Sequence, residues 1–178
     1  MTNSARSEFE GQVPTGGTRT DSRGFTGRNG TRGARQPGGR LMKRINDHNI
    51  AKLRTHGGTF MGQDALVLVT LGAKSGVERS TPVAWFPDSD HSWIVVASAN
   101  GAARNPAWYH NLAAHPDSAA IELAGRRVPV RAEQLHGNTR DHAWRAILAR
   151  VPRFADYERK TDRVIPVIRL RARSEGTR

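Results

Sequence analysis

The sequence contains no cysteine at any of its 178 positions. This absence excludes disulfide bonds, thiolate metal ligands and cysteine nucleophiles, so any redox chemistry has to come from a bound cofactor. Long hydrophobic runs are also missing, because the longest, residues 65–71 and 93–97, have only the length of strands. A membrane-spanning helix needs roughly 20 apolar residues, and we therefore expect no transmembrane segment.

Acidic residues are scarce relative to basic ones. The chain has 28 Lys and Arg against 16 Asp and Glu, which gives a formal net charge of +12. Such an excess favours anionic partners: nucleic acid, acidic lipid surfaces, or a phosphorylated or polycarboxylate ligand. The first residues lack the apolar stretch of a secretory signal, so the cytoplasm is the expected location.

Several motifs that would define other enzyme classes are absent. No Gly-x-Gly-x-x-Gly fingerprint follows a strand, and no phosphate-binding Gly-Lys-Ser/Thr loop opens a helix, which disfavours Rossmann and nucleotide-hydrolase folds. His110 and His115 are five residues apart and off a common helix face, with no accompanying carboxylate-histidine motif. We therefore expect no metal site.

Residues 1–40 differ in composition from the rest of the chain. They hold nine of the 18 glycines and almost no large apolar side chains, so they are expected to be a disordered tail in front of one domain, residues 41–178. Their Arg-Gly pieces resemble segments that bind RNA loosely, with a solvated tail as the simpler alternative. Basic residues on the first predicted helix make peripheral membrane contact a further alternative to packing.

The hydrophobic pattern of the domain indicates a strand-rich α+β fold. Apolar spacing predicts helices over residues 41–54, 107–114 and 139–150, and strands over residues 65–71, 80–86, 93–98, 119–123, 128–135 and 164–170. Three of the links between strands are short turns, which favours antiparallel neighbours over a doubly wound parallel sheet. The expected architecture is a mainly-β barrel with packed helices.

Chemistry-bearing residues gather in two blocks. In the first, a Gly-rich turn carries Lys74 and is followed by Arg79. Backbone N–H groups, an ammonium and a guanidinium together suit phosphate or carboxylate oxygens, although a polar surface turn is the plainer reading. In the second, Arg104 and Asn105 precede a helix start with Trp108, which offers an anion site and an aromatic wall.

The two blocks and the segment near the C-terminus resemble the deazaflavin-dependent nitroreductase family in order and spacing. The shared elements lie between residues 53 and 170: the Gly-Ala-Lys-Ser-Gly turn at 72–76, Arg79, Pro82, Ser98, the Asn-Pro-Ala-Trp-Tyr helix start at 105–109, Asn111, Pro116, Tyr157 and residues 163–167. The resemblance implies a split β-barrel related to FMN-binding oxidases, with the deazaflavin coenzyme F420 in a groove beside the barrel. It also implies hydride transfer from the reduced coenzyme to a quinone, nitro compound or enone.

The resemblance assigns roles to individual residues. It places Lys74, Ser75, Gly76 and Arg79 at the phosphate and polyglutamate tail of the coenzyme, and it places Pro82, Ser98, Trp108 and Asn111 near the ring system. Ser98 and Tyr157 are the expected catalytic residues, as hydrogen-bond or proton donors to the reduced acceptor oxygen, with packing as the alternative for Tyr157.

The chain departs from the family pattern at a few positions. Ala73 and Ala99 stand where relatives often have Arg and Lys, so either Arg104 compensates at the coenzyme or the affinity for it is lower. Relatives that reduce bicyclic nitroimidazoles tend to carry more tyrosines around the acceptor pocket, whereas this chain has Val151 and Phe154 before Tyr157, which disfavours that activity.

Alternatives to the leading function differ in their ligands. A split-barrel protein that uses FMN or haem would not bind F420 preferentially, and a non-enzymatic RNA or lipid binder would act through the tail. The chain is expected to be a monomer or a homodimer.

Overall fold

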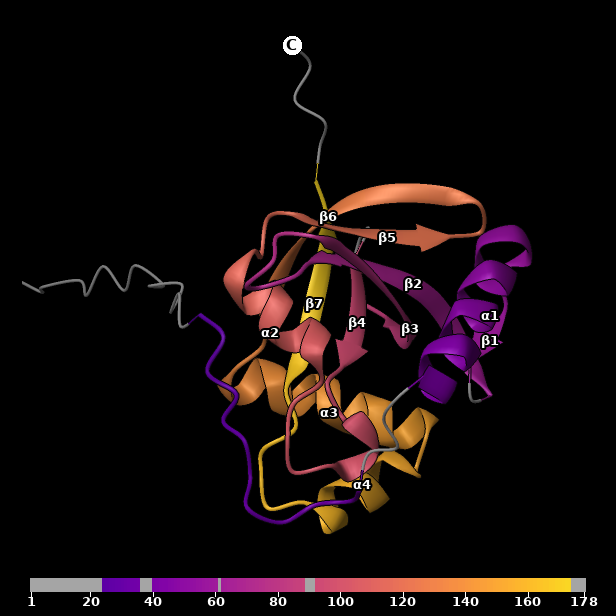
Figure 1. The fold of residues 1–178 in the computed structure, drawn as a ribbon. Helices are drawn as coiled ribbons and strands as arrows, with labels where there is room; N and C mark the ends of the chain where they lie inside the picture. Colours follow the sequence, from indigo (N-terminus) through magenta and orange to yellow (C-terminus); the bar gives the residue numbers. More distant parts are fainter. Residues whose placement is uncertain (1–23, 36–39, 61, 89–91, 174–178) are drawn as a thin grey trace, which may run out of the picture.

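The computed structural model describes residues 24–35, 40–60, 62–88 and 92–173 (Figure 1). The helices are α1 Arg40–His56, the 3-10 helix η1 Ala99–Gly101, α2 Ala107–Ala114, α3 Gly137–Arg150 and α4 Phe154–Lys160. The strands are β1 Thr59–Phe60, β2 Gln63–Leu71, β3 Glu78–Pro87, β4 Ser92–Val96, β5 Ala119–Leu123, β6 Arg126–Gln134 and β7 Val167–Ala172.

Six of the strands form a closed antiparallel barrel. Their order is β2-β3-β4-β7-β6-β5, and β5 pairs back onto β2 through the Val67–Glu122, Leu68–Ile121 and Val69–Ala120 partners. The short β1 extends the sheet by pairing with the start of β2. The prediction of a mainly-β α+β fold with a barrel and packed helices is therefore confirmed.

Strand β2 is buried on both of its faces. Leu66 and Leu68 point into the barrel core, while Val67 and Val69 point outward and pack with Leu53 of α1. Helix α1 lies along the outside of the barrel in Figure 1. This double cover explains why residues 65–69 form a continuous apolar run instead of the alternation of a half-exposed strand.

The remaining helices cover other parts of the barrel. Helix α2 buries Trp108, Tyr109 and Leu112 in the barrel core. Helices α3 and α4 form a second cluster with β3, β4 and β7, in which Phe154 touches the rings of Phe86 and Trp144. Helix α4 lies outside the helices expected from the sequence, because its seven residues closely follow Pro152, a residue type that favours the end of a helix.

A segment that precedes α1 in the sequence packs on the surface of the domain. Residues 24–35 run along its surface from α2 past α4 (Figure 1). Phe25 sits against Tyr109 with 5.5 Å between ring centroids, and the Gly27 N–H donates to the Tyr109 hydroxyl at 2.6 Å. These residues were expected to belong to a disordered tail, and the structure differs there because backbone and glycine contacts replace large apolar side chains. Residues 1–23 and 36–39 lie outside the described residues.

Candidate functional site

The turn between β2 and β3 is built by two glycines. The Gly72 N–H donates to the Val77 carbonyl at 2.9 Å, and the Gly76 N–H donates to the Gly72 carbonyl at 2.8 Å. Gly76 has a φ of +62°, a left-handed conformation that glycine adopts without steric cost. The turn leaves Lys74 and Ser75 exposed at its tip.

Asn111 connects this turn to α2. Its side-chain Oδ1 accepts a hydrogen bond from the Ala73 N–H at 3.0 Å, and its Nδ2 donates to Thr70 Oγ1 at 3.0 Å. Asn111 and Thr70 are both buried. The structure therefore brings together the two blocks that the sequence singled out, with Asn111 as their link rather than as an exposed ligand contact.

Strand register decides which way the β3 residues face. Arg79 is paired with Thr70, so its side chain lies on the same face as Thr70, at the end of the barrel where α2 packs. Pro82 is paired with Val67, whose side chain lies on the outer face under α1. Arg79 thus lies beside the turn and α2, whereas Pro82 lies on the opposite face of the sheet.

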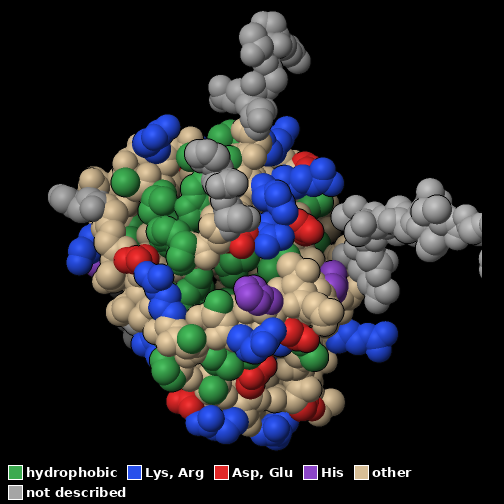
Figure 2. All heavy atoms as spheres, turned by 180° about the vertical axis from the view of Figure 1, so that it is seen from behind, with side chains coloured by type: hydrophobic (Ala, Val, Ile, Leu, Met, Phe, Trp, Pro, Cys, Tyr) green, Lys and Arg blue, Asp and Glu red, His purple; other side chains and the backbone are tan. Residues whose placement is uncertain are grey.

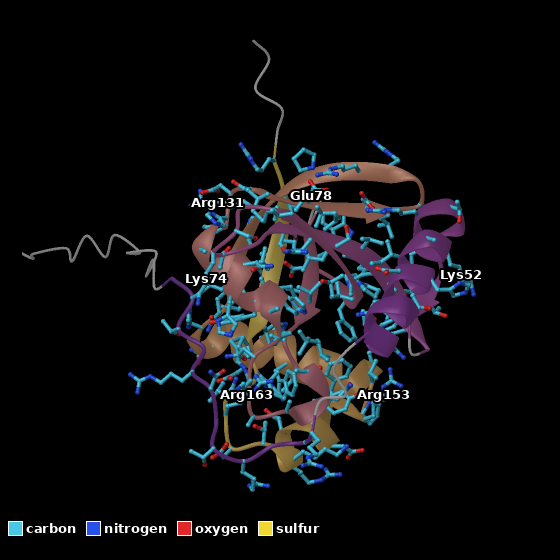
Figure 3. The ribbon with its side chains drawn as sticks, viewed as in Figure 1. Lys52, Lys74, Glu78, Arg131, Arg153 and Arg163 are labelled. Atoms are coloured by element: carbon cyan, nitrogen blue, oxygen red, sulfur yellow. The ribbon has the colours of Figure 1, made fainter. Side chains whose placement is uncertain are left out.

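The cations of the candidate site have no partners within the described part of the chain. This holds for the side chains of Lys74, Arg79 and Arg104, and also for the backbone N–H groups of Lys74 and Ser75. Some other exposed arginines are paired, such as Arg127 with Glu78 at 2.7 Å, whereas the exposed Arg126 has no ion pair among the described residues. Figure 3 shows Lys74 on the side of the molecule where α2 lies. This donor set fits the phosphate and carboxylates of a polyanionic coenzyme.

Ser98 begins an unusual stretch of backbone. It directly precedes η1, in which Ala99, Asn100 and Gly101 have φ values of +46°, +54° and +80°. Left-handed residues with a Cβ are costly and persist only where the surroundings hold them. The next residues lead through Arg104 and Asn105 into α2. The loop 97–105 therefore has a fixed and strained shape next to the candidate site.

A buried guanidinium holds this loop from the inside. Arg163 is 6% exposed and donates to the carbonyls of Ala97, Ser98 and Ala102 and to Asn105 Oδ1, at 2.7–2.9 Å. Burial lowers the pKa of Arg163 from its ordinary value, because the charged form is desolvated. All four acceptors are neutral oxygens of residues 97–105. These hydrogen bonds from Arg163 therefore hold the shape of the loop and form no ion pair.

Two further expected residues are close to the loop or the core. Tyr157 of α4 is half-buried, with its ring 5.2 Å from that of Phe154, and its backbone borders Gly101 of η1. The structure thus places α4 and Tyr157 next to the Ser98 loop. Trp108 is only 6% exposed and belongs to the barrel core, so its indole supports the site from beneath.

Two hollows in the described part of the chain lie elsewhere on the molecule. One of about 620 Å³ lies between α3 and the β3–β4 hairpin, and one of about 580 Å³ lies between residues 26–29 and 162–166. Neither is lined by Lys74, Arg79 or Ser98. Figure 2 shows hydrophobic side chains gathered on the rear face and bordered by Lys and Arg. We locate the candidate site from its unpartnered cations rather than from cavity size, since a long anionic ligand binds along a surface.

Two residues around the site, Tyr109 and Arg163, were not assigned a role from the sequence, and Asn105 was expected at an anion site. Asn105 and Arg163 form the support of the loop, and the Tyr109 hydroxyl donates to Gln134 Oε1 at 2.7 Å while it accepts from Gly27. The packing of Gly27 near this site could have been expected from the regular spacing of the glycines in residues 24–33. The overall composition of the tail does not show this spacing. No metal-binding group of three or more His, Asp or Glu side chains occurs among the described residues, and none of their helices is long and apolar enough to cross a membrane.

Comparison with known proteins connects this geometry to a family. The family model of the F420H(2)-dependent quinone reductases matches residues 41–171. An F420H(2)-dependent quinone reductase of Mycobacterium tuberculosis strain H37Rv is 36% identical over 112 residues, which are 61% of this chain and 74% of that protein.

Solved structures agree with this similarity. A structure described as an F420-H2 dependent reductase, FDR-A, has 31% identity and a TM-score of 0.54, and it covers 64% of this chain and 99% of that one. Another, described as a domain-swapped dimer, has 30% identity and a TM-score of 0.56, with 73% and 97% covered. This chain therefore belongs to the F420H(2)-dependent quinone reductase family and is an oxidoreductase with the deazaflavin coenzyme F420 as its cofactor.

Proposed function

We propose that the hydride transfer takes place at the surface formed by the β2–β3 turn, the start of α2 and the Ser98 loop, with a quinone as the acceptor. The observation that carries this proposal is the set of unpartnered cations at a turn that Asn111 ties to α2. When bound, the reduced coenzyme supplies the hydride. The protein binds the coenzyme, orients it and excludes water.

The β2–β3 turn and the residues near it bind the coenzyme. Lys74 contributes a point charge, Arg79 a planar fork, and Ser75 and Gly76 the backbone and hydroxyl of a phosphate-binding turn. Arg104 lies exposed just before α2 and adds positive charge for the carboxylates of the tail. Ala73 and Ala99 supply no charge, so affinity depends on these three cations. Pro82 and Trp108 act as supports of the sheet and of α2.

Ser98 and Tyr157 are proposed to act on the acceptor. Ser98 lies between β4 and η1 and Tyr157 on α4, and both side chains are half-buried. A hydroxyl in this position can donate a hydrogen bond or a proton to the oxygen that becomes negative as the quinone is reduced. Val151 and Phe154 are each 5% exposed within a core cluster, so Tyr157 is the accessible aromatic side chain of this group.

The test is coenzyme binding by a variant that lacks both turn cations. Each charge-assisted hydrogen bond contributes roughly 1.5–3 kcal/mol, so Lys74→Ala combined with Arg79→Ala should weaken F420 binding at least about tenfold. The change in tryptophan fluorescence on titration gives the Kd. A matched control is Arg171→Ala, which removes an exposed arginine that pairs with Glu133 on the barrel wall.

Two results would contradict the proposal. One is a double variant that binds F420 as tightly as the wild type. The other is tighter binding of FMN than of F420 by the unaltered chain, which would favour the FMN alternative. A turnover screen across quinones, nitroaromatics and enones then identifies the acceptor class.

A further inference from the structure

The glycines of the N-terminal segment recur at every third residue, at positions 24, 27, 30 and 33. We call residues 24–35 the strap. A Cβ on Gly27, Gly30 or Gly33 would fall within contact distance of Tyr109 Oη, of Asp162 Oδ1 and of the Ala103 backbone nitrogen, respectively. A Cβ on Gly24 would meet nothing within 4 Å. Three of the four glycines are therefore needed for close approach to the domain.

The strap bonds directly to the loop 97–105. The Gly30 N–H donates to the Ala103 carbonyl and the Ala34 N–H to the Gly101 carbonyl, both at 2.8 Å. Asn105 joins the strap in two ways. Its backbone N–H donates to Asn29 Oδ1 at 3.0 Å, and its Nδ2 donates to the Gly27 carbonyl at 3.1 Å.

Asp162 fixes the far part of the strap. Its carboxylate accepts hydrogen bonds from the backbone N–H groups of Thr31 and Arg32 at 3.0–3.1 Å and from the Thr31 hydroxyl at 2.5 Å. The neighbouring residue along the chain is Arg163, which bonds to the same loop from within the protein. In Figure 3, Arg163 lies between the barrel and the strap.

The loop is therefore held from two sides. Arg163 takes the carbonyls of Ala97, Ser98 and Ala102, and the strap takes those of Gly101 and Ala103. Five carbonyls within seven consecutive residues are thereby bound from outside the loop. Such dense support is what three successive left-handed residues require in order to persist.

We propose that the strap and Arg163 form a clamp that sets the conformation of the Ser98 loop for hydride transfer, with Asn29, Asn105 and Arg163 as positioning residues. The inference rests on the proposed function in that Ser98 faces the reacting groups. A displacement of about 1 Å in a positioned group can lower turnover by about 10²-fold, so release of the clamp acts on turnover. Coenzyme affinity depends chiefly on Lys74 and Arg79 at the β2–β3 turn, to which the described strap residues make no hydrogen bond, and less on Arg104, which lies on the clamped loop.

A matched pair of glycine variants in the full chain tests the clamp. Gly33→Ala drives a Cβ into backbone, whereas Gly24→Ala places one in open space. We expect Gly33→Ala to lower kcat at least tenfold, to change the Kd for F420 much less than kcat, and to raise hydrogen–deuterium exchange at the amides of Gly30 and Ala34. Gly24→Ala should match the wild type in all three measurements.

A milder variant protects the test against misfolding. Asn29→Ala removes one exposed acceptor, so the protein should fold and show a smaller loss of kcat in the same direction. Arg163→Lys keeps the charge but cannot reach four acceptors at once, and it should lower kcat more than it weakens F420 binding.

The outcomes separate the inference from the proposed function. If exchange shows a released strap in Gly33→Ala while kcat stays at the wild-type value, the clamp has no role in turnover. If exchange is unchanged, the close approach of Gly33 is wrong and the inference fails with it. If the unaltered chain does not bind F420, the proposed function fails instead.

Discussion

At the residue scale, Asn111 shows how one amide can join two parts of a site. Its two hydrogen bonds run to a turn on one side and to a buried threonine on the other, so its side chain has no freedom to rotate. The residue sits in the middle of α2, a helix that also fills the end of the barrel. Loss of this one side chain should therefore affect both stability and binding.

Asn111→Ala is expected to lower the free energy of unfolding by about 1–3 kcal/mol, because Thr70 Oγ1 would lose its buried partner. F420 affinity should fall as well, since the turn would lose its bond to α2. Denaturant unfolding and fluorescence titration measure the two effects. Asn138→Ala on the exposed side of α3 is the control, and equal stability of the two variants would contradict this account.

Tyr157→Phe should lower kcat for the quinone by about 10²-fold or more, the range of a lost proton donor. The phenylalanine keeps the edge-to-face contact with Phe154, so Tm and F420 affinity should stay the same. Steady-state kinetics with a saturating coenzyme separates kcat from binding. An unchanged kcat would leave packing as the role of this side chain.

Asp162 gives the strap a dependence on pH. The pKa of Asp162 is lowered from 3.8 to about 2. The largest cause is the hydrogen bond from the Thr31 hydroxyl, and the hydrogen bond from the Arg32 backbone N–H adds to it. Because the pKa of Asp162 is lower in the folded protein, the stabilisation that its carboxylate gives to the strap is complete above the ordinary pKa. This stabilisation is lost as the pH falls through about 2. Protection of the strap from protease should thus decrease between about pH 4 and pH 2 and lose this dependence in Asp162→Asn. A strap equally protected across this range in the wild type would contradict the assignment.

At the element scale, the β2–β3 turn depends on one left-handed residue. Gly76→Ala should cost about 1–2 kcal/mol, since its φ is +62° and an Ala Cβ is disfavoured there although the space around it is open. Gly76→Asn should be better tolerated, because asparagine adopts this conformation more readily. Thermal unfolding of both variants checks the order, and the reverse order would rule out backbone strain as the cause.

The same scale explains what the sequence could predict. Helix 107–114 agrees with α2, and all six predicted strands are present, because short turns and apolar periodicity are local signals. Helix α4 was missed because Pro152 precedes it at a position that starts a helix as readily as it ends one. The strap was missed because disorder was judged from composition, whereas its contacts depend on the absence of Cβ atoms at fixed positions.

For the candidate site, the sequence could predict residue types better than orientations. Lys74 lies in one turn and Arg79 in the strand that follows it, and this short separation is visible in the sequence. The opposite facing of Pro82 depends on strand register, and the burial of Trp108 depends on how α2 enters the barrel. The support from Arg163 joins positions about 60 residues apart, which no local pattern encodes.

At the scale of the whole molecule, charge should govern how fast the coenzyme arrives. The net charge of +12 attracts a polyanion, and screening at 0.1 M ionic strength limits that attraction to about 10 Å. The association rate constant for F420 should therefore fall steeply between low and high salt in stopped-flow mixing. The Lys74→Ala, Arg79→Ala double variant should show a shallower dependence, and identical slopes would argue that distant charges dominate.

The strap also changes how an Arg-Gly sequence can be understood. When every third residue must lie flush against a surface, glycine is required on one side of the segment and the side chains between are free to vary. Arginine at the intervening positions keeps the outer side of the segment hydrated. A repeat that resembles a flexible nucleic-acid-binding tail can therefore instead be a segment that packs on the domain. A fusion partner or an affinity tag joined close to residue 24 would therefore perturb an enzyme surface rather than an idle end.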